Sequence, residues 1–333
     1  MILVKALFGI VSVSALAVGI SRPADPAALG TPGPVPFPKN NPYSAAKAEL
    51  GRKLFQEGAM SKTGLTPCTW CHEVDRGFHD GRTISIGDPR TALNRHTPSL
   101  LNVGYQKALF WDGRTSSLEE QALMPIAHPD EMDMDLKVLP GVLRAAGYEE
   151  DFKAAFGTSA ITTERVAMAL ATFQRTLTAN DTPFDRYIAG DKTAMSEAAI
   201  RGLELFKGKA NCITCHGGPH FTNALVDGKE AYANTGLYQS PVLDPDSGRF
   251  GVIKNPKASD AMYKNAFRIP TLRGVGRTAP YMHNGQLANL EEVVEFYNRG
   301  GDEGLVPKLG LTDAEKKDLV AFLRTGLTSR RTQ

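Results

Sequence analysis

The stretch Cys68-Thr69-Trp70-Cys71-His72 has a second copy further along the chain, Cys212-Ile213-Thr214-Cys215-His216. C-x-x-C-H is the attachment sequence of a c-type haem. Its two thiols bond to the vinyl groups of the porphyrin, and the His becomes the proximal iron ligand. Because the chain has four cysteines and all of them lie in these motifs, none is left for a structural disulfide. The sequence therefore predicts two covalent haems, held by Cys68, Cys71, His72, Cys212, Cys215 and His216.

Two other interpretations of paired cysteines fit less well. A zinc ribbon also has two C-x-x-C knuckles, but these usually lie about 15–20 residues apart. Here the two pairs are far apart in the chain, and each carries a His directly after its second Cys. A thioredoxin-like redox pair does not need that His. Haem attachment is the interpretation that explains all four cysteines and both histidines.

Size and composition set the broad class of the chain. A length of 333 residues favours two domains, and a hydrophobic content of 42% supports packed cores. The formal net charge of +2 gives no argument for nucleic acid or another strongly charged partner. We therefore expect a two-domain globular protein that does not bind nucleic acid.

The N-terminus has the character of an export signal. Residues 1–20 are largely apolar apart from Lys5, so residues 1–22 are interpreted as a signal peptide or an uncleaved N-terminal anchor. Residues 23–42 are rich in Pro and Gly and predict an extended leader. No later run is long and apolar enough to span a membrane. Export agrees with the haem motifs, because c-type attachment resembles a periplasmic process in bacteria, and we expect a periplasmic protein.

The rest of the chain is a duplication that internal comparison reveals. Similar segments lie around the two haem motifs. Before the motifs, residues 50–55 resemble residues 201–206. After the motifs, residues 97–104 resemble 269–276, residues 111–113 resemble 283–285, and residues 118–120 resemble 290–292. Each half then ends in a predicted helix that begins after a threonine, Thr162 or Thr312, and Thr312 has the T-x-x-E spacing of a capping box.

This pattern predicts a mostly α fold of two cytochrome c-like haem domains, with long loops and little β structure. The expected domains are residues 43–185 and 186–333, joined near residues 181–194. Residues 232–263, rich in Pro, Asp and Gly, are expected to form a long loop.

The duplication also predicts a difference between the two haems. Tyr297 lies 14 residues after His283 and seven after Leu290, and the same offsets in the first half both fall on Pro125. If this helical position faces the distal side of each haem, the second iron has a phenolate oxygen available. The first iron faces a proline, which has no atom that can coordinate. The alternative is that Tyr297 is an ordinary core aromatic of an amphipathic helix.

These residues together resemble the bacterial dihaem cytochrome c peroxidase superfamily, and within it the MauG-type enzymes. The resemblance covers about residues 40–327. It rests on both haem motifs and on three further segments, which are Phe110-Trp111-Asp112-Gly113-Arg114, Thr278-Ala279-Pro280-Tyr281-Met282-His283-Asn284-Gly285 and Phe296-Tyr297-Asn298-Arg299-Gly300-Gly301. Ordinary members have Met at the position of Tyr297, whereas MauG-type members have Tyr. The resemblance thus implies that His216 and Tyr297 ligate the second iron.

The resemblance also implies an open first haem. Ordinary peroxidases carry a distal His, which leaves that haem on activation, in a segment that corresponds to Ser85-Ile86-Gly87-Asp88-Pro89. This chain has Asp88 or Pro89 there, and His79 and His96 do not match the position. His128 remains a rival ligand, although its surroundings predict a loop.

Further roles follow from the resemblance by position. Trp111 matches the Trp between the two haems, where an indole can divide one long electron transfer into two short ones. Gln121 and Glu131 match the distal polar pair of the peroxidatic haem. Glu131 would act as a general acid–base on bound peroxide, and Gln121 would orient the peroxide or a water. Without the resemblance, packing would explain Trp111 and surface solvation would explain Gln121 and Glu131.

Members of the superfamily also bind a calcium ion between the domains, and hard cations take oxygen ligands. Thr278 and Pro280 match two of the carbonyl donors. The third donor is usually an Asn before Thr-Pro, and His96 stands in that position here. We therefore expect a calcium site: if the third donor is a main-chain carbonyl, the change to His96 matters little, and if it is a side chain, the site is weakened.

The resemblance leaves three functional classes to weigh. A MauG-like oxidase would use hydrogen peroxide to bring both haem irons to a high-valent state and would then oxidise Trp or Tyr residues of a periplasmic partner protein. A scavenging cytochrome c peroxidase would reduce peroxide with electrons from a small cytochrome or cupredoxin. A plain dihaem electron carrier would perform no peroxide chemistry. Tyr297 and the missing distal His favour the first class, and an open haem argues against the third.

Overall fold

The computed structural model describes residues 29–88, 90–225, 228–237 and 246–329, so the predicted signal segment lies outside the described residues. The described chain is mostly helical, as predicted, and has a single antiparallel pair of two-residue strands. The helices and strands are α1 (Ala45–Phe55), α2 (Leu118–Ala127), α3 (Leu139–Ala145), α4 (Glu149–Phe156), α5 (Thr163–Thr176), α6 (Pro183–Ile188), α7 (Glu197–Lys207), β1 (Tyr232–Ala233), β2 (Phe267–Arg268), α8 (Leu290–Asn298) and α9 (Asp313–Ala321). A π-helical turn, Phe322–Gly326, continues α9.

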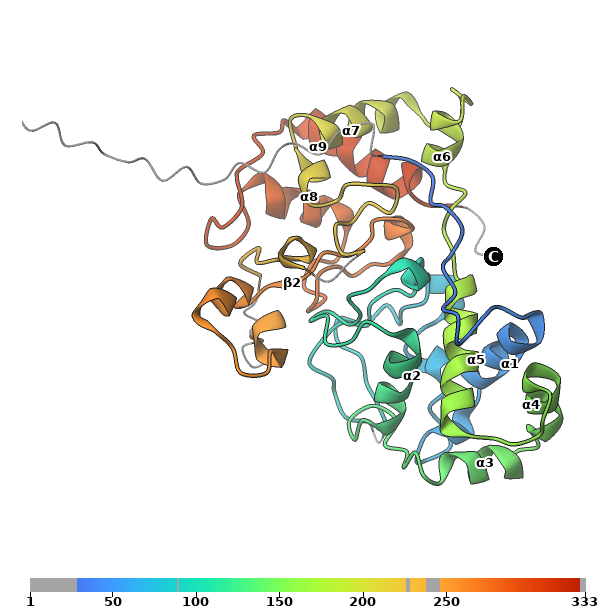
Figure 1. Cartoon of the computed structure of the whole chain (residues 1–333). Coiled ribbons are helices and arrows are strands. Elements are labelled where there is room, and N and C mark those ends of the chain that lie inside the picture. Colours follow the sequence, from blue (N-terminus) through green and yellow to red (C-terminus); the bar gives the residue numbers. More distant parts are fainter. Residues whose placement is uncertain (1–28, 89, 226–227, 238–245, 330–333) are drawn as a thin grey trace, which may run out of the picture.

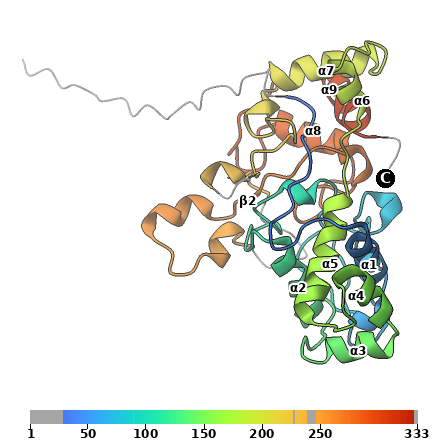
Figure 2. The same ribbon diagram turned by 45° about the vertical axis from the view of Figure 1, so that its right-hand side comes forward.

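The molecule has two lobes, and each has its own hydrophobic core. In Figures 1 and 2, α1 to α5 form one lobe and α6 to α9 form the other. The first core runs from Leu50 to Ala179, and the second begins at Phe184 and ends at Leu327. Phe184 of α6 belongs to the second core, so the two cores separate between Ala179 and Phe184.

The same helix crossing occurs in both lobes. Helix α1 packs on α5 so closely that a Cβ at Gly51 would lie 2.0 Å from the carbonyl oxygen of Ala169. Helix α7 packs on α9 in the same way, and a Cβ at Gly202 would lie 2.0 Å from the carbonyl oxygen of Asp318. Glycine is required at both positions because any side chain would push the two helices apart. The predicted duplication is therefore confirmed at the level of packing.

The N-terminal caps of α5 and α9, the last predicted helix of each half, also agree with the sequence. The Thr162 hydroxyl accepts a hydrogen bond from the Arg165 amide at the start of α5. Thr312 and Glu315 form a capping box at the start of α9. These caps satisfy amide groups that have no partner within the helix.

Duplication extends to unusual backbone conformations. Phe110 and Met282 both have a left-handed φ, of 63° and 75°, directly before the paired segments that begin at Trp111 and His283. Matching antiparallel bridges flank these turns, Leu109 with Thr115 and Tyr281 with Leu287. Non-glycine residues seldom adopt this conformation, so its occurrence at matching places indicates a common origin.

The predicted leader joins the two lobes. Residues 29–42, named the strap from here on, run from the second lobe down to α1 (Figure 1, dark blue). The guanidinium of Arg273 in the second lobe donates to the Gly30 carbonyl at 2.9 Å. The Tyr105 hydroxyl in the first lobe donates to the Gly33 carbonyl at 2.7 Å. The strap thus contacts both lobes along the described part of its length.

Residues 232–263 contain β1, two short 3-10 turns and residues outside the described chain. The described part is otherwise irregular, which agrees with the loop that the sequence predicts. Within the described residues, no helix has the length and apolar character needed to cross a membrane.

Candidate haem sites

The first haem motif forms a tight turn that aims its histidine. Cys68–Trp70 is a 3-10 turn, and the His72 amide donates to the Cys68 carbonyl at 3.0 Å. The His72 Nδ1 donates to the Phe78 carbonyl at 2.8 Å. Burial lowers the pKa of His72 to about 4, so the ring is neutral. A neutral imidazole whose Nδ1–H is engaged offers Nε2 as a metal ligand.

The second haem motif repeats this arrangement. Cys212–Thr214 is again a 3-10 turn, and the His216 Nδ1 donates to the Phe221 carbonyl at 3.1 Å. Both carbonyls belong to phenylalanines with a left-handed φ, 63° at Phe78 and 53° at Phe221. The sequence analysis did not identify these two residues. A phenylalanine shortly after each motif is the available signal, but the backbone angle that turns its carbonyl toward the His is not visible in the sequence.

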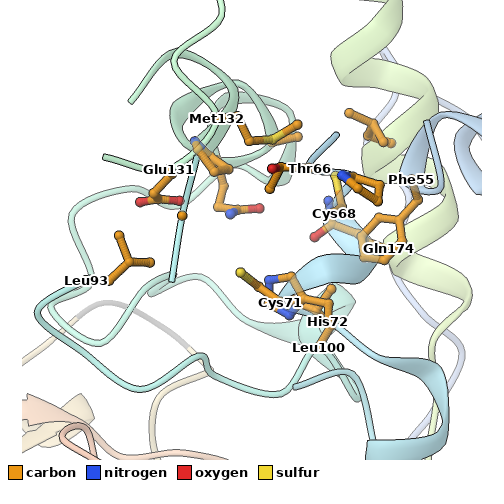
Figure 3. A pocket seen from close by; sticks show the side chains of 16 residues that line it. Phe55, Thr66, Cys68, Cys71, His72, Leu93, Leu100, Glu131, Met132 and Gln174 are labelled. Atoms are coloured by element: carbon orange, nitrogen blue, oxygen red, sulfur yellow. The ribbon is translucent and has the colours of Figure 1, made fainter. Parts of the chain in front are cut away.

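A pocket opens beside the first motif and contains the residues predicted for the distal side. Its wall includes Cys68, Cys71 and His72 on one side, and Gln121, Pro125 and Glu131 on another. Figure 3 shows Cys71 and His72 at one edge of the pocket, with Glu131 and Met132 across from them. The remaining lining is largely apolar and includes Phe55, Leu93, Leu100, Ala122 and Leu170. An apolar slot with two thiols and an oriented His fits a covalent haem.

Glu131 and Gln121, the two residues predicted for the distal side, have different surroundings in this pocket. Burial raises the pKa of Glu131. The side-chain oxygen of Gln121 is buried and has no hydrogen-bond partner within the described chain. A buried amide oxygen without a partner is costly, so it indicates that a donor group binds there. The Met132 amide donates to the Pro125 carbonyl at 3.2 Å, which holds the Glu131 loop against the end of α2.

Neither Asp88 nor His128 lines the first pocket, although His128 lines the larger cavity that adjoins it. The Asp88 carboxylate accepts from the amide and hydroxyl of Thr63 at 3.1 and 2.7 Å, and Pro89 lies outside the described residues. His128 is exposed, and its Nδ1 accepts from the Asp130 amide at 3.2 Å.

Two other histidines of the first half are engaged elsewhere as well. The His79 Nε2 donates to the Arg277 carbonyl at 3.0 Å, and the His96 Nδ1 donates to the Arg82 carbonyl at 2.7 Å. Neither residue lines the first pocket, although His96 lines the larger cavity that adjoins it.

Tyr297 lies beside the second motif. It projects from α8, which begins at the N-cap Asn289. Burial raises the pKa of Tyr297, and the nearby Cys215 and Cys212 thiols add to the shift. No described residue forms a hydrogen bond with its hydroxyl. Tyr297 is thus a partly buried phenol near the two thiols of the second motif, and its hydroxyl is unbonded within the described chain.

Trp111 lies where the two lobes meet. Its side chain is only 8% exposed, and its indole N–H donates to the His96 carbonyl at 2.8 Å. The ring packs edge-on against His283, with 6.4 Å between ring centroids, and His283 stacks on Phe267 at 3.5 Å. Trp111 and His283 are the paired positions of the duplication, so the two halves meet through equivalent residues.

Trp111 also belongs to the surroundings of the first haem. With His72, Gln121 and Glu131, it lines a larger cavity that adjoins the first pocket. The structure therefore brings together the three residues predicted to be catalytic.

Of the predicted calcium donors, the His96 carbonyl has another partner, whereas Thr278 uses its hydroxyl and not its carbonyl in a hydrogen bond. The Thr278 hydroxyl donates to the Val275 carbonyl at 3.2 Å, and the His96 carbonyl accepts the indole N–H of Trp111. A carbonyl oxygen has two lone pairs, so this hydrogen bond leaves one free. No group of three or more His, Cys, Asp or Glu residues in the described chain could hold a metal ion. A calcium ion here would therefore depend on backbone oxygens.

Two cytochrome c-like lobes, each with a C-x-x-C-H turn and an oriented histidine, define a dihaem c-type oxidoreductase. Comparison with known proteins makes this more specific. The family model of di-haem cytochrome c peroxidases, which includes MauG, matches residues 45–193. The chain is 40% identical over 303 residues to the methylamine utilization protein MauG of Methylorubrum extorquens, a match that covers 88% of this chain and 82% of the relative.

Two further relatives agree. The chain is 38% identical over 331 residues to cytochrome-c peroxidase IdrP1 of a Pseudomonas species, with 87% of this chain and 83% of the relative covered. The crystal structure of a MauG-like protein associated with microbial copper homeostasis matches with a TM-score of 0.80 and 33% identity, over 89% of this chain and 93% of that one. The chain belongs to the dihaem cytochrome c peroxidase and MauG family, and this membership implies two haem cofactors.

Proposed function

We propose that this protein is a MauG-like enzyme of the periplasm that uses hydrogen peroxide to oxidise Trp or Tyr residues of a partner protein. The observation that carries the proposal is the difference between the two haem sites. Pro125 lines the pocket of the first site, whereas Tyr297 lies beside the thiols of the second. One site is suited to peroxide binding, and the other is suited to storage of an oxidising equivalent.

Catalysis at the first site depends on side chains that move protons. Haem c, held by Cys68, Cys71 and His72, would supply the iron that accepts oxidising equivalents from peroxide. Glu131 takes a proton from one peroxide oxygen and returns it to the other, which converts the departing oxygen into water. The Gln121 oxygen, which has no partner in the described chain, accepts a hydrogen bond from peroxide or a water and fixes its orientation.

Tyr297 and Trp111 connect this chemistry to a partner. Haem c at the second site would be held by Cys212, Cys215 and His216. The Tyr297 oxygen would be the second protein ligand of that iron, and the negative charge of a phenolate would favour oxidised over reduced iron. Trp111, between the two lobes, passes single electrons, and its N–H stays bonded to the His96 carbonyl.

A calcium ion bound by the carbonyl oxygens of Thr278 and Pro280 would strengthen the contact between the lobes. His79, which donates to the neighbouring Arg277 carbonyl, holds this segment on the first lobe. Any attachment to a membrane would involve residues 1–22 alone.

A scavenging cytochrome c peroxidase is the second candidate function. It is supported by the 38% identity to a relative that bears the peroxidase name. In that case the partner is a small redox protein that donates electrons, and no residue of it is modified.

The distinguishing experiment adds hydrogen peroxide to the fully oxidised protein without any reductant. A MauG-like enzyme reacts at once and forms a long-lived state that holds two oxidising equivalents, and a protein with an accessible Trp then accelerates the decay of this state. A requirement for prior half-reduction, followed by fast oxidation of a small cytochrome, would instead identify a scavenging peroxidase.

A further inference from the structure

The chain has two tryptophans, and they occupy opposite environments. Trp111 is buried between the lobes, whereas Trp70 is 42% exposed. Trp70 lies inside the first haem motif, directly before Cys71. The corresponding residue of the second motif is Thr214, so attachment of haem by a C-x-x-C-H turn does not require an indole at this position.

Trp70 faces away from the haem pocket. Cys71 and His72 line that pocket, but Trp70 lines neither it nor the adjoining cavity. The indole N–H donates to the Ile86 carbonyl at 2.7 Å, and the guanidinium of Arg82 lies 5.1 Å from the ring centroid. The exposed face of the ring is therefore held in a fixed position, while a haem bound in the pocket lies on the other side of the motif.

Two short routes connect this ring with the first haem site. One route follows the backbone to Cys71, whose sulfur would be bonded to the porphyrin. The other follows the hydrogen bond to Ile86 and then Gly87, which lines the haem pocket. Gly87 packs tightly on the Glu131 loop, since a Cβ at residue 87 would lie 2.9 Å from the Cα of Glu131.

The segment of the chain that carries Trp70 also has exposed apolar side chains. Leu65, Val74 and Ile86, from the same segment around the first motif, are 77%, 41% and 36% exposed. Exposed Trp with apolar neighbours is typical of contact surfaces, and Trp is enriched among the residues that dominate binding.

We propose that Trp70 is a surface electron relay, through which one-electron donors too large to enter the pocket reduce the oxidised first haem site. This inference rests on the proposed reaction of that site with peroxide. It provides a route to the outside that differs from the route through Trp111, which lies between the lobes.

The electron balance of the relay is simple. Reduction of one hydrogen peroxide to two waters takes two protons and two electrons. Trp70 gives one electron to the oxidised site and becomes a radical cation, which keeps its N–H proton because the Ile86 carbonyl is not a base. It then regains the electron from a one-electron donor, and a second cycle completes the reaction. The Arg82 guanidinium disfavours positive charge on the ring, which favours rapid return of an electron to it.

The test compares Trp70→Phe, which cannot be oxidised readily, with Trp70→Tyr, which can. Ferrocyanide serves as the one-electron donor, and the rate of the first reaction with peroxide is measured separately by stopped-flow absorbance. We expect Trp70→Phe to slow ferrocyanide oxidation about tenfold with no change in the peroxide step, and Trp70→Tyr to recover most of the rate. Tyr43→Phe, at another exposed aromatic of the first lobe, is the matched control and retains the wild-type rate.

A second readout needs no variant. When wild-type protein receives peroxide without a donor, the oxidised indole should react with oxygen species, so peptide mass spectra should show oxygen added at Trp70. Equal ferrocyanide rates in wild type and Trp70→Phe, with an unmodified Trp70, would show that the relay is wrong while the proposed function stands. A wild-type protein that does not react with peroxide would overturn both proposals, because the relay would have no oxidant.

Discussion

The two haem sites share their proximal side and differ on their distal side. In each, a histidine directly after the second Cys donates its Nδ1–H to the carbonyl of a phenylalanine with left-handed backbone. Across from it, the first site has Pro125 in its pocket wall, whereas the second has Tyr297 beside its thiols. The two halves have therefore kept the same arrangement around the proximal histidine and differ in the residue at the paired distal position.

The largest expected effect concerns Glu131, the proposed acid–base residue of the first site. Glu131→Gln should lower the rate of the peroxide reaction by about 10²–10⁴-fold, because the amide cannot transfer the proton. Burial raises the pKa of Glu131, so the carboxylate that acts as the base forms only above the usual range for glutamate. The wild-type rate should accordingly rise with pH through this raised pKa, and the variant should lose that rise.

Stopped-flow absorbance at several pH values measures this effect. Glu120→Gln on the same lobe, whose carboxylate bonds to Thr115, is a control that should keep the wild-type profile. An unchanged rate and pH profile in Glu131→Gln would remove Glu131 from the mechanism.

A second variant would make the second site resemble the first. The oxidised wild type should show one high-spin and one low-spin ferric haem by electron paramagnetic resonance, with the low-spin signal from the Tyr297 site. Tyr297→Ala should disturb the low-spin signal without loss of covalent haem. Two low-spin signals in the resting wild type would indicate a distal ligand at the first site, with His128 as the first suspect. An unchanged spectrum in the variant would show that Tyr297 is not a ligand.

The connection between the sites is the third target. Trp111→Phe should slow the oxidation of a partner protein about tenfold, and far more than it slows the reaction with peroxide. The reason is that electron transfer through Trp111 follows cleavage of the oxygen–oxygen bond. The two rates are separated by double-mixing stopped flow. Equal slowing of both would assign Trp111 a packing role, which its contacts with His283 and the His96 carbonyl could also explain.

The smallest effects probe the shared scaffold. Gly51→Ala and Gly202→Ala each place a methyl group against a helix backbone, and overpacking of this kind costs about 1–3 kcal/mol. Because the two crossings are equivalent, the two variants should lose similar free energy of unfolding in denaturant titrations. Gly141→Ala, where a Cβ would meet open space, is the control. A large inequality between the two crossings would mean that the lobes are not equivalent in packing.

Much of this arrangement could be predicted from the sequence because the haem motifs and the duplication are local patterns. The cap at Thr162 and the capping box at Thr312 follow from short segments, and the structure confirms them. The grouping of Gln121 and Glu131 in one pocket depended on the family resemblance, since each is an ordinary surface residue by sequence.

Other features depend on the backbone path and could not be predicted. Nothing in the residue type shows that Phe78 and Phe221 adopt a left-handed φ. The hydrogen bond from Trp111 to the His96 carbonyl joins residues whose proximity only the folded chain creates. Phe184 belongs to the second core because α6 turns toward that lobe, and this direction of α6 is not visible in the sequence.

The strap has a consequence for the order of assembly. Leu29 packs on the second core, and the bond between Gly30 and Arg273 joins residues 243 positions apart. The Arg273 side chain is fully buried and is also bonded to Asp185, so its site is complete only after the second lobe has formed. Contacts between residues so far apart in the chain form late in folding. The strap, although it is the first part of the described chain to be synthesised, is therefore among the last parts to pack. Resistance of residues 29–42 to a protease would thus report that both lobes have matured.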